Sequence, residues 1–263
     1  MITVAILGAA GRMGGALIRC SRQIKDVRVV AAVEHPGNRA IGKDAGALAG
    51  LDGIGVDISD DPRSVAVAEV VIDFTLHNST PEYAKLCASL GRPMIIGSTG
   101  LNEQETAVVK DAAKKIPIVW TPNMSLGVNL MFSLVRKAAS VLGSSYRVEI
   151  SETHHVHKKD APSGTALRLG QKVADGRGDD FRTVMVHNPV DRSGGEGKII
   201  IHSFREGEVV GDHTVKFENS GERIEFTHHA ESRDAFALGA LHAAKWVVGR
   251  KPGIYDMQDV LGL

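Results

Sequence analysis

The sequence predicts an α/β protein with one parallel-sheet domain and a second, α+β domain whose sheet is mixed and open. Three observations lead to this prediction. Short apolar runs alternate with helical patterns in the first half of the chain, a glycine-rich turn joins the first run to a helix, and strand patterns dominate the second half. Alternation of strands and helices is typical of parallel sheets with right-handed crossovers.

Composition narrows the class of protein. The chain has 263 residues with 43% hydrophobic content, enough for one large domain or two modest ones. It carries 31 basic and 31 acidic residues, so we expect neither a nucleic acid nor a membrane as partner. Cys20 and Cys87 form no CxxC pattern, which favours a reducing, cytoplasmic location. We see no signal peptide and no apolar run of membrane-spanning length.

The first half of the chain predicts repeated strand–helix units. Its apolar runs are rich in β-branched residues and lack strict polar alternation, as in parallel strands buried on both faces. The expected strands are Thr3–Leu7, Val27–Val33, Val70–Phe74, Met94–Ile96 and Ile116–Trp120. Helices are expected at Gly15–Arg22, at Pro81–Leu90 after the capping candidates Ser79 and Thr80, and at Asn102–Lys115 with Asn102 as its cap.

The pattern changes near Asn129. Helices are expected at Leu130–Val141, Thr165–Ala174 and Ser232–Val248. Strands are expected at Arg147–Ser151, Lys198–Phe204, Glu208–Phe217 and Arg223–His229, with a further candidate at Phe181–Val186. Glycine-rich turns at 193–197 and 219–221 separate several of them, which predicts a largely β second domain.

A glycine loop follows the first strand directly and reads Gly8-Ala-Ala-Gly11-Arg-Met-Gly14. It departs from GxGxxG because Ala10 occupies the second glycine position. Glycines in such a loop permit a tight turn, and the helix N-terminus offers N–H groups to a pyrophosphate. With a strand before it and a helix after it, the loop predicts a Rossmann-type dinucleotide site; a turn without a ligand is the alternative.

Glu34 ends the second expected strand, twenty residues beyond Gly14, where a ribose-binding acid belongs. A carboxylate there accepts hydrogen bonds from the ribose hydroxyls and repels a 2′-phosphate, so we favour NADH. His35, Arg12 and Arg39 offer positive charge nearby, which leaves NADPH open. A solvated acid at the strand end is the alternative.

Small polar residues follow three more of the expected strands. They lie at Asp73–Thr75, Gly97–Thr99 and Thr121–Met124. Ligands of open α/β sheets gather at the carboxyl ends of the strands. Each segment alone could be an ordinary turn, but together they line one rim, and the second and third are candidates to contact the nicotinamide and its ribose.

The segment 152–166 concentrates titratable groups and reads ETHHVHKKDAPSGTA. Strand alternation would place His155 and His157 on one face and His154 on the other. A helix then begins at Ser163-Gly-Thr165, whose N-terminus binds anions, and Lys158 and Lys159 add positive charge. A small carboxylate fits this arrangement, and histidine can supply a proton near neutral pH.

Three other interpretations of this segment stay open. It could be a solvated charged loop, or it could bind phosphate, since helix N-termini do not distinguish phosphate from carboxylate. A zinc site could combine His154, His155 or His157 with Glu152 or Asp160. Adjacent histidines point apart on a strand and neither cysteine is near, so we expect no metal.

Taken together, these motifs resemble the dihydrodipicolinate reductase family over nearly the whole chain. The resemblance rests on GAAGRMGG at the start, DFT at 73–75, GSTG at 97–100, TPNMSLGVN at 121–129, E-x-H-H-x-H-K-x-D-x-P-S-G-T-A at 152–166 and GDHTV at 211–215. It implies a cytoplasmic homotetramer with a discontinuous Rossmann domain (1–128 and 232–263) that binds the dinucleotide. Residues 129–231 would form the substrate-binding and oligomerisation domain, and the two domains would close on the ligands.

The family resemblance also implies a reaction. Hydride would pass from NADH or NADPH to a cyclic unsaturated dicarboxylate, giving tetrahydrodipicolinate in the diaminopimelate route to lysine. His154 would be the general acid and Lys158 a second proton donor or charge stabiliser. Substrate contacts would come from His155, Ser163, Gly164 and Thr165. Cofactor contacts would come from Gly8, Ala9, Ala10, Gly11, Arg12, Met13, Glu34, Gly97, Ser98, Thr99, Thr121, Pro122, Asn123 and Met124.

One departure and two alternatives accompany the resemblance. His35 stands where many relatives carry arginine, which puts a preference for NADPH in doubt. Another dicarboxylate or imine reductase on the same fold, such as an aspartate dehydrogenase-like enzyme, would share these features. A non-catalytic NAD(H)-sensing module would explain the glycine loop but would leave the 152–166 segment without a role.

Overall fold

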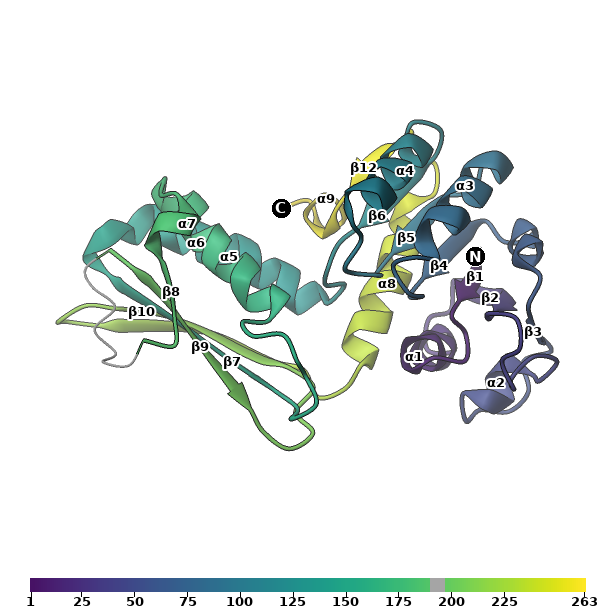
Figure 1. The fold of residues 1–263 in the computed structure, drawn as a ribbon, viewed down its shortest axis with the longest axis horizontal. Coiled ribbons are helices and arrows are strands. Elements are labelled where there is room, and N and C mark those ends of the chain that lie inside the picture. Colours follow the sequence, from purple (N-terminus) through teal and green to yellow (C-terminus); the bar gives the residue numbers. More distant parts are fainter. Residues whose placement is uncertain (190–196) are drawn as a thin grey trace. The chain divides into compact units, whose positions relative to one another are not determined.

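The computed structural model describes residues 1–189 and 197–263 (Figure 1). The expected turn at 193–197 falls largely outside the described residues. The chain forms two compact units, one of Met1–Leu126 with Arg233–Gly262 and the other of Gly127–Ser232 with Leu263.

The first unit is built on a seven-stranded parallel sheet, as the apolar runs predict. Its strand order is β12-β6-β5-β4-β1-β2-β3. The strands are β1 (Ile2–Leu7), β2 (Val27–Val33), β3 (Ile58–Ser59), β4 (Val70–Asp73), β5 (Met94–Ile96), β6 (Pro117–Trp120) and β12 (Gly253–Tyr255). The sequence patterns did not reveal β3 or β12, because two or three residues carry too little periodicity.

Helices cover both faces of this sheet (Figure 1). They are α1 (Arg12–Ser21), α2 (Ala45–Leu48), the 3₁₀ turn η1 (Pro62–Val67), α3 (Thr80–Leu90), α4 (Glu103–Ala113), α8 (Asp234–Val247) and α9 (Met257–Leu261). One apolar core lies under α1 and α8, and the other lies under α3 and α4. The expected cap Asn102 forms a reciprocal capping box with Glu105 at the start of α4.

The second unit has a five-stranded sheet that is mixed and open, in the order β11-β10-β7-β9-β8. Its strands are β7 (Arg147–His154), β8 (Met185–His187), β9 (Ile199–Arg205), β10 (Asp212–Glu218) and β11 (Arg223–His229). β10 runs antiparallel to β7 and β11, whereas β9 runs parallel to β7 and β8. The fold class predicted from the sequence is therefore confirmed for both units.

Helices in the second unit bury one face of its sheet. They are α5 (Leu126–Leu142), the 3₁₀ turn η2 (Gly143–Ser145), α6 (Gly164–Arg177) and α7 (Phe181–Val184). A single apolar core joins α5 and α6 to the sheet. A Cβ added to Gly176 of α6 would lie 2.3 Å from the carbonyl oxygen of Arg136, so the two helices cross where a side chain would not fit.

Two predicted elements of the second unit differ from the structure. The candidate strand Phe181–Val186 was wrong over its first four residues, which form α7: Asp180 caps that helix and the Phe181 ring packs against Gly170 of α6. The strand expected from Glu208 begins at Asp212. The preceding residues form a turn in which the amide of Val209 donates to the carbonyl of Glu206.

The segment Leu126–Ser145 is long and apolar enough to cross a membrane by length and composition. Helices in the core of a protein pass the same test. Phe132 and Val135 lie on the side of this helix that packs into the core of the second unit.

Candidate active site

The glycine loop of the first unit has the geometry of an anion-binding turn. Gly8 has a positive φ of 72°, and its N–H donates to the carbonyl of Val33 at 2.9 Å. α1 begins at Arg12, and the cap residue Gly11 supplies no side-chain bond to the helix N-terminus. The loop lines a hollow of about 200 Å³ whose walls include Ala9, Ala10, Gly11 and Arg12. Uncapped N–H groups beside such a hollow suit a phosphate.

Close backbone packing explains why Gly14 is glycine. A Cβ on Gly14 would lie 2.4 Å from the carbonyl oxygen of Gly8 and 2.5 Å from that of Ala9. The first turn of α1 therefore rests directly on the loop. This is the close helix–strand contact that the third glycine of a dinucleotide fingerprint permits.

Glu34 lies directly beside the glycine loop. One carboxylate oxygen accepts from the amide of Ala10 at 3.1 Å and the other accepts from the amide of His35 at 3.0 Å. The His35 ring and Arg39 are exposed. The acid thus sits where the spacing predicts, at the end of β2 and against the turn that would hold the pyrophosphate.

The rim segment Gly97–Thr99, which follows β5, is joined to the end of β4 by hydrogen bonds around a buried carboxylate. Asp73 is fully buried and accepts from Thr75 Oγ1 at 2.6 Å and from Thr80 Oγ1 at 2.7 Å. Burial raises the pKa of Asp73, and the bonds from the threonines and Ser98 oppose that shift. The Ser98 hydroxyl also donates to the carbonyl of Thr75 at 3.0 Å. This hydrogen bond connects the segments that follow β4 and β5.

Gly97 and the residues after it show how closely the rim is packed. A Cβ on Gly97 would lie 2.2 Å from Cε1 of the Phe74 ring, so the ring occupies the space of a side chain. Ser98 is buried, whereas Thr99 is exposed. Exposed Thr99 can therefore reach a ligand at the carboxyl edge of the sheet.

The third rim segment follows β6. Thr121 and Met124 are buried, Asn123 is half-buried and Pro122 is exposed. A Cβ on Gly239 of α8 would lie 1.8 Å from the carbonyl oxygen of Met124, so α8 packs directly on this segment. Because β1, β4, β5 and β6 are neighbouring parallel strands, all the expected cofactor residues in this unit lie at one edge of the sheet.

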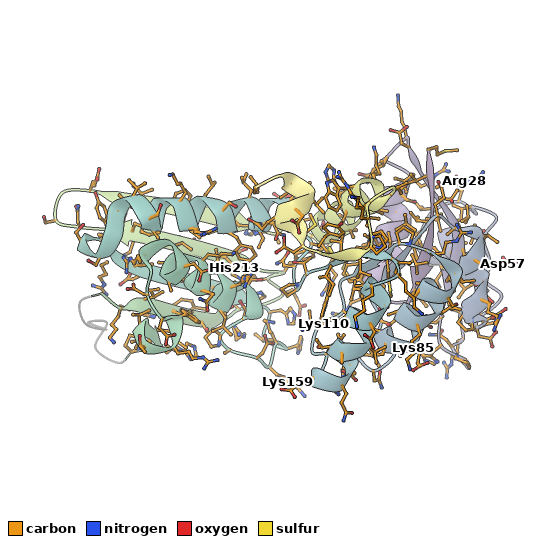
Figure 2. All side chains as sticks on the ribbon, turned by 90° about the horizontal axis from the view of Figure 1, so that it is seen from above. Arg28, Asp57, Lys85, Lys110, Lys159 and His213 are labelled. Carbon is orange, nitrogen blue, oxygen red and sulfur yellow. The ribbon has the colours of Figure 1, made fainter. Side chains whose placement is uncertain are left out.

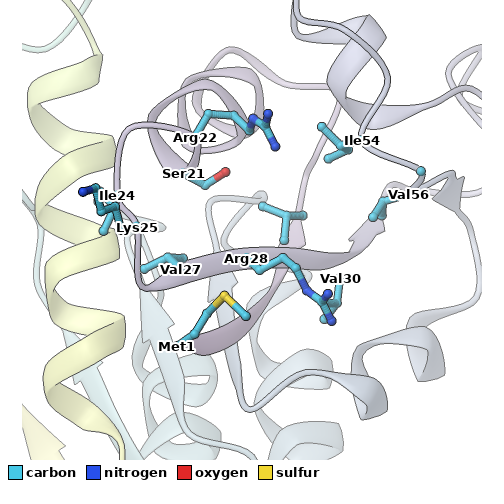
Figure 3. Close-up of a pocket in the computed structure, with 12 residues that line it drawn as sticks. Met1, Ser21, Arg22, Ile24, Lys25, Val27, Arg28, Val30, Ile54 and Val56 are labelled. Atoms are coloured by element: carbon cyan, nitrogen blue, oxygen red, sulfur yellow. The ribbon is translucent and has the colours of Figure 1, made fainter.

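A larger hollow of about 700 Å³ lies elsewhere in the first unit (Figure 3). Its lining includes Met1, Arg22, Lys25, Arg28 and Val56. It shares no residue with the glycine loop or with the rim segments. Volume alone would therefore point away from the residues expected to bind the cofactor.

In the second unit, β7 delivers His154 beside a buried carboxylate. Glu152 is completely buried, and its Oε2 accepts from His154 Nδ1 at 2.5 Å. β7 ends at His154, so the expected alternation of faces does not continue through His155 and His157. Their rings instead lie on the turn after the strand, with centroids 6.0 Å apart.

Glu152 is held in its charged form by its surroundings. Burial alone would raise the pKa of Glu152, but hydrogen bonds from His154, Ser203 and Arg205, with the charge of His154, outweigh burial and lower the pKa to about 2. The guanidinium of Arg205 donates through Nη1 to both carboxylate oxygens at 3.1 Å. A buried carboxylate is stable in its charged form only while such hydrogen-bond and ion-pair partners remain in place.

Ser163 and His213 connect this network to α6. Ser163 caps the helix by accepting from the amide of Ala166 at 3.2 Å, and its own amide donates to Glu152 at 3.1 Å. Its hydroxyl lies 3.2 Å from Nε2 of His213. Burial, reinforced by the charge of His154, lowers the pKa of His213 to about 3, so this ring is neutral at pH 7. Figure 2 labels His213 inside the second unit.

The two lysines of the segment differ in environment. Lys158 has 23% of its side chain exposed and binds Asp160 at 2.8 Å. Lys159 is exposed at the surface (Figure 2). The amide of Lys158 donates to the carbonyl of His155 at 3.1 Å, which folds the turn back on itself. Lys158 is therefore the better placed of the two to act beside the histidines.

The N-terminus of α6 offers an open approach. Gly164 is exposed, and a Cβ added to it would meet no atom within 4 Å. Thr165 is half-buried in the next position. A helix of 14 residues carries partial positive charge at this end. An anionic group can therefore reach the backbone amides of Gly164 and Thr165.

Within residues 1–189 and 197–263, no group of three or more His, Cys, Asp or Glu side chains is arranged to hold a metal ion. His154 is instead hydrogen-bonded to Glu152, and His213 lies within hydrogen-bonding distance of Ser163. Glu152, one of the possible zinc ligands considered above, is bound by an arginine and an amide.

Sequence reasoning missed several residues of this cluster. These residues are Arg205, Ser203 and His213. They come from β9 and β10, well beyond the motif in sequence, and the strand register brings them beside Glu152. His213 belongs to the motif GDHTV at 211–215, but nothing in the sequence indicated that its side chain lies beside Glu152. A Cβ on Gly211 would lie 3.1 Å from His154 Nε2, so a side chain at that position would crowd the ring.

Two family models match the chain. One is described as "Dihydrodipicolinate reductase, N-terminus" and matches residues 2–124; the other is described as "Dihydrodipicolinate reductase, C-terminus" and matches residues 127–261.

Curated relatives agree over the full length. A 4-hydroxy-tetrahydrodipicolinate reductase of Anaeromyxobacter dehalogenans is 49% identical over 100% of this chain and 98% of its own. One from Alkalilimnicola ehrlichii is 48% identical over 99% and 98%.

Solved structures are similar in fold. A dipicolinate-bound dihydrodipicolinate reductase from Paenisporosarcina sp. TG-14 aligns with a TM-score of 0.76 at 24% identity, covering 97% of each chain. An amine dehydrogenase from Mycobacterium smegmatis aligns with a TM-score of 0.61 at 12% identity, covering 97% of this chain and 94% of its own.

Proposed function

The chain belongs to the dihydrodipicolinate reductase family. From that premise we propose which residues bind the cofactor, which bind the substrate and which supply the proton. It is an NAD(P)H-dependent oxidoreductase that reduces 4-hydroxy-tetrahydrodipicolinate to tetrahydrodipicolinate in the diaminopimelate pathway of lysine biosynthesis. The relatives support this activity and not an NAD(H) sensor or a different imine reductase.

The first unit is the dinucleotide-binding domain in this proposal. The glycine loop and the N-terminus of α1 hold the pyrophosphate, and Glu34 accepts from the ribose hydroxyls. Thr99 and the segment Thr121–Met124 contact the nicotinamide end. The hollow beside the loop and the backbone contacts that exclude a side chain at Gly14 support this assignment. The bound nicotinamide supplies the hydride.

NADH is the preferred coenzyme in this proposal. The Glu34 carboxylate faces the loop, where it would repel a 2′-phosphate, and histidine stands at position 35 in place of the arginine that many relatives carry. Steady-state kinetics with each coenzyme test the preference. A lower KM for NADPH than for NADH would contradict it.

The second unit is the substrate-binding and oligomerisation domain. The substrate carries two carboxylates, and the segment 154–165 offers cationic side chains and helix amides that match them. Gly164 and Thr165 hold one carboxylate through their amides, with Ser163 fixing the turn, and His155 contacts the substrate. The open space at Gly164 supports this placement.

Reduction leaves negative charge on the substrate that a nearby acid must neutralise. His154 donates this proton, and Lys158 stabilises the developing charge or supplies a second proton. The observation that carries the assignment is the bond from His154 Nδ1 to buried Glu152, which fixes the ring beside the N-terminus of α6. No step requires a metal, so we expect a chelator to leave the rate unchanged.

The natural assembly in this proposal is a cytoplasmic homotetramer. The helices cover one face of the five-stranded sheet, and Phe204, on the other face, is 53% exposed. That face is available to pair with another copy of the chain. Light scattering should give about four times the chain mass of 28.0 kDa.

The assay that tests the residue roles follows NADH oxidation with freshly generated substrate. His154→Gln should lower kcat by about two to four powers of ten because the proton donor is lost. Its dissociation constant for NADH should stay within about twofold of the wild type, since the ring does not bind the cofactor. Wild-type kcat in this variant would contradict the assignment.

The adjacent lysines provide a matched comparison in the same assay. Lys158→Ala should also lower kcat strongly, whereas Lys159→Ala should have a mild effect because its side chain is exposed. An inactive Lys159 variant beside an active Lys158 variant would reverse the two roles. Oxaloacetate with ammonia serves as the control substrate pair and should give no comparable rate.

A further inference from the structure

We propose that Glu152 and Arg205 form a positioning pair for the general acid: they act on the reaction through the His154 ring and do not touch the substrate. This inference rests on the proposed role of His154. It adds two residues, one of them distant in sequence, to the machinery of the reduction.

The strand register brings the pair to the histidine. Side chains two apart on a strand share a face, so Glu152 and His154 of β7 lie on the same side of the sheet. On the parallel neighbour β9, Ser203 is opposite Glu152 and Arg205 is opposite His154. On the antiparallel neighbour β10, His213 is opposite Glu152. Three strands thus place their polar side chains in one patch.

The carboxylate of Glu152 accepts hydrogen bonds both from the His154 ring and from the backbone at the start of α6. Its Oε2 accepts from His154 Nδ1, and its Oε1 accepts from the amide of Ser163 at 3.1 Å. One acid therefore sets both the orientation of the imidazole and the start of the helix that would hold the substrate carboxylate. Because Glu152 is fully buried, no water competes for these bonds.

Arg205 keeps the carboxylate charged and fixes the turn that follows β7. Its Nη1 and Nη2 both lie 3.1 Å from Glu152 Oε1. The same guanidinium donates through Nε to the carbonyl of Lys158 at 3.3 Å and through Nη2 to the carbonyl of Asp160 at 2.5 Å. One planar group thus joins the carboxylate behind His154 to the turn that carries Lys158.

The consequence for the chemistry concerns which ring nitrogen acts. With Nδ1–H donated to Glu152, Nε2 is the atom left to give a proton. The N–H bond at Nε2 breaks, the substrate receives the proton, and the ring becomes the neutral Nδ1–H tautomer, which still matches the carboxylate. Gly211 has no side chain beside Nε2, and a Cβ there would lie 3.1 Å from that nitrogen and crowd the approach of a substrate.

The test compares two carboxylates of the same strand. Glu152→Gln keeps one oxygen that can accept from the Ser163 amide but loses the acceptor that faces His154. It should therefore lower kcat about 100-fold while the KM for substrate and the NADH dissociation constant stay within about twofold. Glu149→Gln is the control, used once light scattering shows that it keeps the wild-type mass: Glu149 points to the opposite face of the sheet and binds Lys216 at 2.7 Å, away from His154. It should keep kcat within about twofold of the wild type. Equal kcat values for the two variants would overturn the proposal.

A double-mutant cycle separates action through His154 from a general structural effect. In a His154→Gln background, adding Glu152→Gln should lower kcat by no more than about twofold, because the ring it positions is gone. A further loss as large as in the wild-type background would overturn the proposal. If His154→Gln itself kept wild-type kcat, the proposed function would fail instead. A slow His154→Gln beside a fast Glu152→Gln would reject only the positioning pair.

A measurement on the unaltered enzyme covers the case in which Glu152→Gln does not fold. In ¹⁵N-histidine-labelled protein, the neutral His154 ring should carry its proton on Nδ1, with a strongly downfield proton signal from the short bond to Glu152. His154→Gln assigns the signal by its loss. A neutral His154 ring protonated on Nε2 would overturn the proposal.

Discussion

At the scale of single residues, the second unit places a charged carboxylate and a neutral imidazole side by side. The Glu152 carboxylate is charged and the His213 ring is neutral. Both side chains are buried beside His154. The His154 and His213 rings meet edge to face with centroids 5.1 Å apart. Because His213 is neutral, it places no second positive charge beside the His154 ring.

Acid should destabilise the protein through His213. The pKa of this ring is lowered from 6.5 to about 3, so the unfolded chain binds more protons between these values. Its contribution to stability is present above pH 6.5 and is lost as the pH falls toward 3, by at most about 1.4 kcal/mol per pH unit. Glu152, with a pKa lowered from 4.5 to about 2, adds a similar loss below pH 4.5.

Urea unfolding between pH 6.5 and 4.5 measures this effect. His213→Gln should flatten the fall in unfolding free energy across that window. His242→Gln, which removes an exposed histidine of α8, should leave the fall in place. An unchanged slope in His213→Gln would show that this ring is not the source.

Local motifs predicted the residues of the cluster that are close in sequence. His154, Lys158 and Ser163 could be named from the 152–166 segment alone because they share one short segment. Arg205 could not, since its place opposite His154 depends on the pairing of β7 with β9, and nothing in a single strand sequence specifies its partner.

At the scale of elements, the structure shows why βα units could be predicted and short elements could not. The strands of the first sheet are buried on both faces, so their apolar runs were continuous and easily recognised. α7 was mistaken for a strand because four residues carry no helical period, and its formation depends on the Asp180 cap and on packing against α6. β10 begins at Asp212 and not at Glu208, because the amide of Val209 donates to the carbonyl of Glu206 and folds the preceding residues into a turn.

Two neighbouring glycines of α1 test the packing of the nucleotide loop. Gly14→Ala should lower the unfolding free energy by about 1–3 kcal/mol, because its Cβ would press on the backbone of Gly8 and Ala9. It should also weaken NADH binding about tenfold or more, since the loop must move.

Gly15→Ala is the matched control for stability. Its Cβ would meet only the flexible end of Arg19, at 3.4 Å, and alanine favours helix by about 1 kcal/mol over glycine. Chemical unfolding and NADH fluorescence titration give both quantities. Equal stability of the two variants would contradict the close contact at Gly14.

At the scale of the whole molecule, the proposed function gives the two units different tasks in the reduction. The first presents a glycine loop and a polar rim at one edge of a parallel sheet. The second presents a buried acid–base network and an open helix N-terminus. In the proposed function, a dianionic ring accounts for the lysines and histidines that gather in the segment 152–166, although the chain as a whole is neutral.

The most direct test of this account is a crystal structure with NADH and dipicolinate, a planar cyclic dicarboxylate. We expect one carboxylate within about 3 Å of the amide nitrogens of Gly164 and Thr165, and the ring facing Nε2 of His154. Dipicolinate bound away from both α6 and the His154 ring would contradict the central claim.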